Sequence, residues 1–87
     1  MSEAEVFMST GQYIGPSRTV EFVFQRALDD AYWDVKILAR GANADLEILR
    51  QFVSSDATGT RRLHYVVRNN KNTPAAFTRT AVRIPST

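Results

Sequence analysis

The sequence predicts an all-β protein, a small antiparallel β-sandwich of six to seven short strands. Apolar and polar side chains alternate in several separate segments, which is the period of a strand with one buried face. Connections rich in Gly, Pro, Asn and Ser separate these segments. With 87 residues the chain is long enough for one domain and one small core.

The first segments alternate over short distances. VFM at 6–8 and QYI at 12–14 predict one or two short amino-terminal strands. Gly15-Pro16-Ser17 is a turn signal, and a strand follows at 19–26. Its apolar face is formed by Val20, Phe22 and Phe24, whereas Val23 breaks the alternation.

The segment at 32–40 repeats this pattern. Trp33, Val35 and Ile37 form one face, and the opposite face carries Tyr32, Asp34, Lys36 and Leu38. Gly41-Ala42-Asn43 then supplies residues that tolerate positive φ, as a tight connection requires.

The segment at 45–55 fits two structures. Leu46, Leu49, Phe52 and Val53 match a helical stripe, with Asn43 or Asp45 as a cap. The strand interpretation is preferred because the flanking segments resemble hairpin partners and residues 54–60 suit a β-loop. It places Leu46, Ile48 and Phe52 inside, with Arg50 as an exception.

Two further strands are predicted in the last third of the chain. At 61–69, Leu63, Tyr65 and Val67 oppose Arg62, His64, Val66 and Arg68. At 76–84, the predicted inner face is Thr78, Thr80, Val82 and Ile84, and the outer face is Phe77, Arg79, Ala81 and Arg83. Residues 69–74 favour a turn, so residues 63–85 are predicted to form a hairpin.

VVRNNKNTPAAF at 66–77 resembles the Val-x-Asn-x-Gly-Asn-x-Pro strand and turn of bacterial immunoglobulin-like and CARDB-type domains. Lys71 stands where those families usually have Gly, and the chain lacks the Cys pair of antibody domains. The resemblance covers the last third of the chain. It implies an immunoglobulin-like or fibronectin-III-like sandwich and a role in binding or spacing.

Charge is uneven along the chain. Residues 1–56 carry five basic and nine acidic side chains, and residues 57–87 carry six basic and no acidic ones. This asymmetry is explained either by an anionic ligand or by pairing of basic strands with acidic ones; the second explanation is preferred.

The sequence predicts no catalytic site, no metal site and no cofactor. His64 is the only histidine, and no nucleophile elbow or Gly-rich phosphate loop accompanies it. Without cysteine there is no thiol nucleophile and no Cys-ligated zinc site. Asp29, Asp30 and Asp34 suggest either a hard-cation site or, as preferred, a solvated turn.

The predicted address is cytoplasmic, unless the chain is a fragment of a larger protein. Acidic residues occupy the amino terminus where a secretory signal is basic, and no segment approaches the ~20 apolar residues of a membrane helix. Residues 1–4 and 86–87 are expected to be flexible.

The leading functional prediction is a non-enzymatic interaction or assembly module that binds a protein partner or itself, as a homo-oligomer. This prediction depends on the apolar residues that lie on the predicted outer faces. So many apolar residues on an outer face indicate that another surface covers them. The predicted partner-binding residues are Leu38, Leu49, Val53, Val66 and Phe77, and Val23 shares their exposure.

Two alternatives remain open from the sequence. A carbohydrate-binding module is suggested by Tyr13, Tyr32, Trp33 and Tyr65. Anion or nucleic-acid binding is suggested by an arginine-rich face, with predicted anion-binding residues Arg62, His64, Arg68, Arg79 and Arg83 and further basic residues Arg61 and Lys71. Neither glycan nor nucleic acid is the favoured partner.

Overall fold

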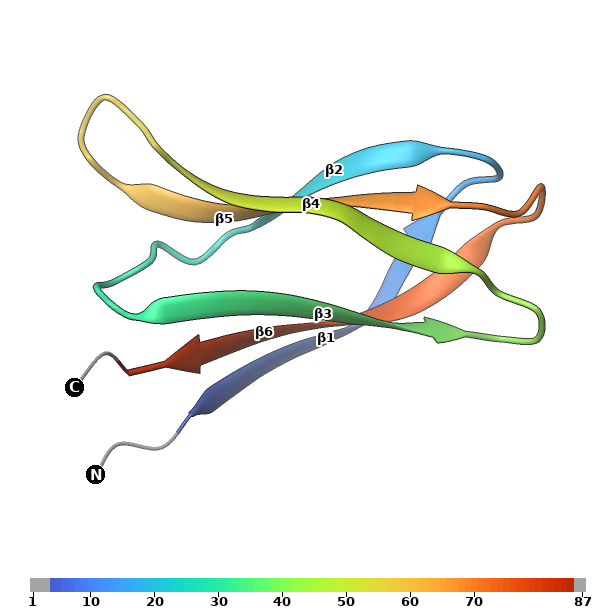
Figure 1. Cartoon of the computed structure of the whole chain (residues 1–87), viewed down its shortest axis with the longest axis horizontal. Helices are drawn as coiled ribbons and strands as arrows, with labels where there is room; N and C mark the ends of the chain where they lie inside the picture. The colour runs from blue at the N-terminus through green and yellow to red at the C-terminus, as the bar shows by residue number, and fades with distance from the viewer. Residues whose placement is uncertain (1–3, 86–87) are drawn as a thin grey trace.

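The computed structural model describes residues 4–85 and confirms the all-β sandwich. Within these residues, six strands form two antiparallel three-stranded sheets that face each other (Figure 1). The strands are β1 (Glu5–Ile14), β2 (Thr19–Phe24), β3 (Tyr32–Arg40), β4 (Leu46–Ser55), β5 (Arg61–Asn69) and β6 (Ala75–Ile84). We name the sheet of order β1-β6-β3 sheet A and that of order β2-β5-β4 sheet B. The flexibility expected for residues 1–3 and 86–87 concerns residues outside the described range.

The chain repeatedly changes sheet. Only β4 and β5 are consecutive strands paired in one sheet, and residues 56–60 connect them as the predicted loop. The predicted hairpin over residues 63–85 is wrong, because β5 is the central strand of sheet B and β6 the central strand of sheet A. The turn-forming residues at 70–74 instead carry the chain from one sheet to the other (Figure 1).

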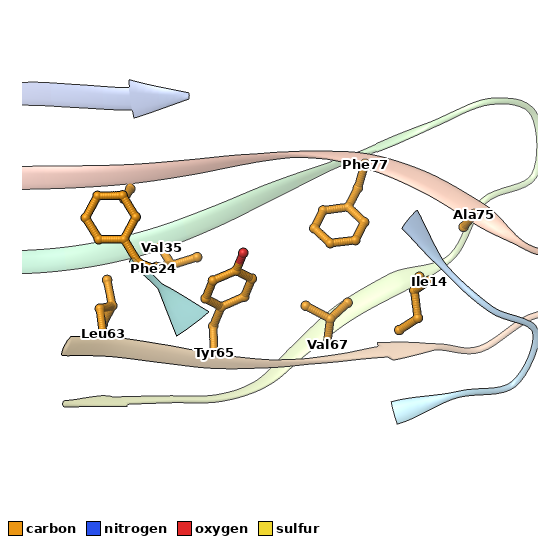
Figure 2. Packing of buried hydrophobic residues seen from close by; sticks show 9 residues of the cluster. Ile14, Phe24, Val35, Leu63, Tyr65, Val67, Ala75 and Phe77 are labelled. Carbon is orange, nitrogen blue, oxygen red and sulfur yellow. The ribbon is translucent and has the colours of Figure 1, made fainter. Parts of the chain in front are cut away.

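The core fills the space between the sheets, where side chains from both inner faces meet (Figure 2). Alternation in β3 and β5 has the predicted phase, so Val35, Leu63, Tyr65 and Val67 are all buried. Phe22 stacks on its neighbour Tyr65 within sheet B at a centroid distance of 5.4 Å, and it meets Phe77 of sheet A edge to face at 5.5 Å. The buried apolar residues are Ile14, Phe24, Val35, Leu63, Tyr65, Val67, Ala75, Phe77 and Ala81.

The predicted faces of β6 are wrong. Phe77 and Ala81 point into the core and are 0% exposed, so Arg79 and Arg83 also face inward. Thr80, Val82 and Ile84 consequently face outward. Both faces of this central strand contain apolar residues, so alternation alone did not fix the phase, and a one-residue shift exchanges the faces.

The segment at 46–55 is strand β4, so the helical alternative is wrong. Leu46 and Ile48 face inward as predicted, but the β4–β5 register shifts between Ile48 and Arg50. Because this β-bulge inserts one residue, Phe52 pairs with His64 and points outward, against the prediction. The bulge also explains Arg50, which strict alternation placed inside as an exception and which faces outward beside Val66.

The two predicted amino-terminal segments are one strand. β1 runs through residues 5–14, and its register shifts between Ser9 and Gln12, where Gly11 has a φ of +83°. At the β3–β4 connection, Gly41 and Asn43 have φ values of +90° and +59°, which confirms the predicted positive-φ positions.

Candidate docking face

The outer face of sheet A is rich in exposed apolar side chains. The described residues include eight large apolar side chains that are exposed, and six of them lie on this face. The assignment follows from the register, since residues that pair across the three strands share a face. The six are Val6, Met8, Tyr13, Tyr32, Leu38 and Ile84.

Among residues 4–85, the charges on this face are confined to β3. The β1–β6 half presents only uncharged side chains, which include Ala76, Thr78, Thr80 and Val82 in addition to the apolar ones. Thr78 is 3% exposed, and its Oγ1 accepts a hydrogen bond of 3.1 Å from Arg40 Nε. We define the outer A face as the outward side chains of β1, β6 and β3.

The acidic residue of the outer A face is already partnered. Gln51 Nε2 donates to Asp34 Oδ1 over 2.7 Å, and Lys36 Nζ lies 3.4 Å from Asp34 Oδ2. These interactions, led by the Gln51 hydrogen bond, lower the pKa of Asp34 below its ordinary value. Gln51 Oε1 also accepts from the Val35 backbone N–H over 3.0 Å, which ties the edge of sheet B to the edge of sheet A.

The outer A face has the size of a small interface. Three strands about 4.8 Å apart and about ten residues long, at ~3.3 Å per residue, give a projected area of roughly 450 Å². Contiguous apolar patches of about 300–600 Å² are the largest that monomeric proteins usually expose, and such patches are frequently functional. The outer A face also carries Asp34, Lys36 and Arg40, but it holds six of the eight exposed large apolar side chains and is the main candidate for contact with a partner.

The predicted partner-binding residues do not form one surface. Leu38 lies on the outer A face and is 57% exposed, whereas Leu49 and Val53 are exposed on β4 and Val66 is half-buried on the outer side of sheet B. Phe77 is in the core, so its predicted outward position is wrong. Val23, on β2, is half-buried on the outer side of sheet B.

Five residues of the outer A face were not among the predicted partner-binding residues, although the sequence holds one signal for them. Val6 and Met8 alternate with Phe7, so apolar residues occupy both faces of β1, as expected for a strand covered on both sides. The missed residues are Val6, Met8, Tyr13, Tyr32 and Ile84.

The predicted anion-binding residues divide between two places. Arg62, His64 and Arg68 lie on the outer face of sheet B, whereas Arg79 and Arg83 lie between the sheets. Their predicted joint patch is therefore wrong.

Acidic neighbours accompany the basic residues on the outer face of sheet B. Glu47 is the cross-strand partner of Arg68, and Glu21 Oε2 lies 3.2 Å from His64 Nδ1. Arg62 Nη1 is 3.9 Å from Asp56 Oδ2 in the β4–β5 loop. The preferred explanation of the charge asymmetry is thus confirmed for these residues: basic carboxy-terminal strands are central, and acidic side chains flank them.

The inward arginines contact aromatic rings and acids. Arg79 Cζ lies 4.8 Å from the centroid of the Phe24 ring, and its Nε is buried without a hydrogen-bond partner. Arg83 forms ion pairs of 2.9 Å with Glu5 and 2.7 Å with Asp29. The Arg83 hydrogen bond is the main cause that lowers the pKa of Asp29, and Asp29 in turn raises the pKa of Arg83.

The three aspartates that suggested a cation site have separate partners. Asp29 pairs with Arg83, Asp30 with Arg61 at 2.6 Å, and Asp34 with Lys36. Within residues 4–85, no three acidic, His or Cys side chains are grouped as a metal would require. The same residues form no pocket and contain no helix that would span a membrane.

The aromatic residues that suggested sugar binding lie in two separate places, between the sheets and on the outer A face. Trp33 is half-buried between the sheets, where it stacks on Phe7, and Tyr65 is buried. Tyr13 and Tyr32 are exposed on the outer A face, but they pair with Ala76 and Ile84, eight residues apart on β6. That separation is about 26 Å, too long for two rings to hold one sugar.

Comparison with protein-family models, with curated proteins and with solved structures gives no match.

Proposed function

We propose that the protein is a non-enzymatic assembly module that associates with a second copy of itself through the outer A face. The observation that carries the proposal is the gathering of six exposed large apolar side chains on this one face. A half-buried antiparallel sheet normally presents polar residues to water. Burial of these six apolar side chains against another surface removes them from water.

The molecular surface supports association. Its accessible area is 5671 Å², against about 5,200 Å² expected from size scaling for a chain of its mass. The nine buried apolar residues form a small core for the two sheets. A second copy packed on the outer A face adds buried apolar area that the monomer lacks.

A second copy is favoured over a different protein by the charge distribution. In the described part of the chain, the β1–β6 half carries no charge that a complementary partner could pair with, so an identical surface suits it as well as any other. On β3, Asp34 and Lys36 carry opposite charges close together. A two-fold axis in the plane of the interface, crossing β3 between them, sets each against the opposite charge of the other copy.

The size of the face sets the expected strength of association. Two copies bury roughly 900 Å² in total, below the ~1,200 Å² at which stable interfaces begin. The dimer is therefore weak and reversible, with a dissociation constant in the micromolar range or above. This strength suits a module that acts when several copies are brought together.

The finer fold proposed is immunoglobulin-like. The orders β2-β5-β4 and β3-β6 correspond to strands B-E-D and C-F of that fold, and β1 lies beside β6 where the seventh strand is expected. The resemblance of residues 66–77 supports this assignment, since these residues form the end of β5, its connection to β6 and the start of β6. Such sandwiches commonly serve as binding modules, and the cytoplasm stays the proposed address.

Sedimentation equilibrium of three proteins tests the proposal. Wild type, Leu38→Glu and Leu49→Glu are compared from about 1 to about 500 µM, a range that spans weak association. Leu38 and Leu49 are matched, at 57% and 51% exposed, but only Leu38 lies on the outer A face. Wild type and Leu49→Glu should approach twice 9.8 kDa as concentration rises, and Leu38→Glu should stay near 9.8 kDa.

Two outcomes contradict the proposal. One is a wild-type mass of 9.8 kDa at every concentration. The other is equal weakening by the two substitutions, which would place the interface elsewhere.

A further inference from the structure

Three polar side chains form a chain of hydrogen bonds across the outer face of sheet B. Ser54 Oγ lies 2.6 Å from His64 Nε2, and His64 Nδ1 lies 3.2 Å from Glu21 Oε2. The three residues come from β4, β5 and β2, which are adjacent in that order. This cluster lies on the sheet opposite the outer A face, so it is independent of the proposed assembly function.

The carboxylate determines which imidazole nitrogen carries the proton. An ionised carboxylate only accepts hydrogen bonds, so the hydrogen bond with Glu21 requires a proton on His64 Nδ1. In the neutral ring, Nε2 is then an acceptor, and the Ser54 hydroxyl donates to it. A hydroxyl that donates to a neutral imidazole is in the arrangement that activates serine nucleophiles.

The imidazole is held in this orientation by its surroundings. The Phe52 ring stacks on it with a centroid distance of 4.7 Å and an interplanar angle of 7°. Arg50 Cζ lies 4.2 Å from the centroid of the same Phe52 ring. The His64 side chain is only 17% exposed, whereas Ser54 is exposed and open to a reagent.

We propose that Ser54 is a nucleophile that accepts acyl groups from activated carboxylic esters, with His64 as the base and Glu21 as a positioning residue. Ser54 Oγ attacks the carbonyl carbon of the ester as its proton moves to His64 Nε2. The bond from that carbon to the leaving oxygen then breaks, and the leaving group takes the proton from the imidazole. The products are an O-acyl serine and an alcohol or phenol, so the step balances.

The neighbouring charge favours this reaction. Arg62 is the cross-strand partner of Ser54 on the same face, so its cationic side chain adds positive charge beside an acyl oxygen on Ser54. A guanidinium there stabilises the negative charge that develops on this oxygen. The outer face of sheet B is open, so no surrounding wall selects one particular ester. The acyl donors are therefore small activated aryl esters, and the product is a covalently modified Ser54.

The experiment uses p-nitrophenyl acetate and peptide mass spectrometry. Ser55 is the internal reference, since it is also exposed and adjacent in the chain but on the other side of β4. General base assistance contributes about 10² to 10⁴-fold, so Ser54 should acetylate at least about tenfold faster than Ser55.

Variants separate activation from a structural role. His64→Gln should bring Ser54 down to the rate of Ser55, and Glu21→Gln should lower the Ser54 rate. Glu47→Gln, the matched control on the other edge strand of sheet B, should leave both rates unchanged. A Ser54 rate no greater than that of Ser55 in the wild type overturns the proposal without any variant. So does a His64→Gln protein that is folded by circular dichroism and keeps the wild-type rate at Ser54.

Discussion

Two phenylalanine substitutions test which faces of β4 and β6 form the core. Phe77 on β6 is 0% exposed and meets Phe22 edge to face at a centroid distance of 5.5 Å. Phe52 on β4 points outward and packs between His64 and Arg50. The change to Ala removes the same atoms at both positions, so any difference in cost comes from their environments.

The structure predicts very different costs. Phe77→Ala loses a fully buried ring and leaves a cavity, at a cost of about 3–5 kcal/mol. Phe52→Ala loses one stacking and one cation–π contact near the surface, at a cost of about 1 kcal/mol. A domain of this length has a total stability of roughly 4–13 kcal/mol, so Phe77→Ala should remove much of it.

Urea unfolding monitored by tryptophan fluorescence measures both costs. Trp33 is the only tryptophan, and its ring lies 5.7 Å from that of Phe7 and 5.6 Å from that of Phe24 between centroids. Its emission therefore reports separation of the sheets. Equal costs for the two variants, or a larger cost for Phe52→Ala, would refute the assigned faces.

Three further predictions concern buried charge, acid and backbone conformation. Arg79→Met should destabilise by about 1 kcal/mol in urea unfolding, because it removes the cation–π contact of the guanidinium with the Phe24 ring; an unchanged urea midpoint would count against that contact. Arg83 lowers the pKa of Asp29 below 3.8, so the Asp29 carboxylate stabilises the fold above pH 3.8 and that contribution is lost as the pH falls through the lowered pKa. The urea midpoint of Asp29→Asn should thus lie below that of wild type at pH 7 and converge with it in acid, and a constant gap would exclude this ion pair as the cause. Gly41 has a φ of +90°, and a Cβ added there would meet no atom within 4 Å, so Gly41→Ala should cost about 1 kcal/mol from strain alone, and a neutral result in thermal unfolding would contradict that.

Much of the fold is predictable from local patterns. In β3 and β5 one face is clearly apolar and the other polar, and both strands have the predicted phase. The Gly41 to Asn43 connection has the predicted positive φ values because few residues other than Gly and Asn adopt them easily. These features depend only on neighbours in the chain.

The errors occur where the outcome depends on distant segments. β6 has apolar residues on both faces, so its phase is fixed only by the strands that pair with it in sheet A. The bulge at Leu49 that turns Phe52 outward is a property of the β4–β5 pairing. Whether β5 and β6 pair as a hairpin or enter different sheets likewise depends on contacts with the rest of the chain.

The same difference between local pattern and distant contacts explains which residues of the docking face could be predicted. Leu38 was identified because β3 alternates clearly, whereas Ile84 was placed inside with the rest of its strand. Phe77 was offered as a surface residue for the same reason and is buried. The Ser54, His64 and Glu21 cluster joins three strands, so its assembly was not visible in the order of residues along the chain.

The most direct test of self-association measures the reactivity of Met8, which is 62% exposed on the outer A face. Its oxidation by hydrogen peroxide is followed by mass spectrometry at low and at high protein concentration, because the oxidation of methionine depends on its exposure. We predict that the rate constant for Met8 falls several-fold at high concentration in the wild type and stays constant in Leu38→Glu. A wild-type rate constant that is the same at every concentration would show that no second copy covers this face.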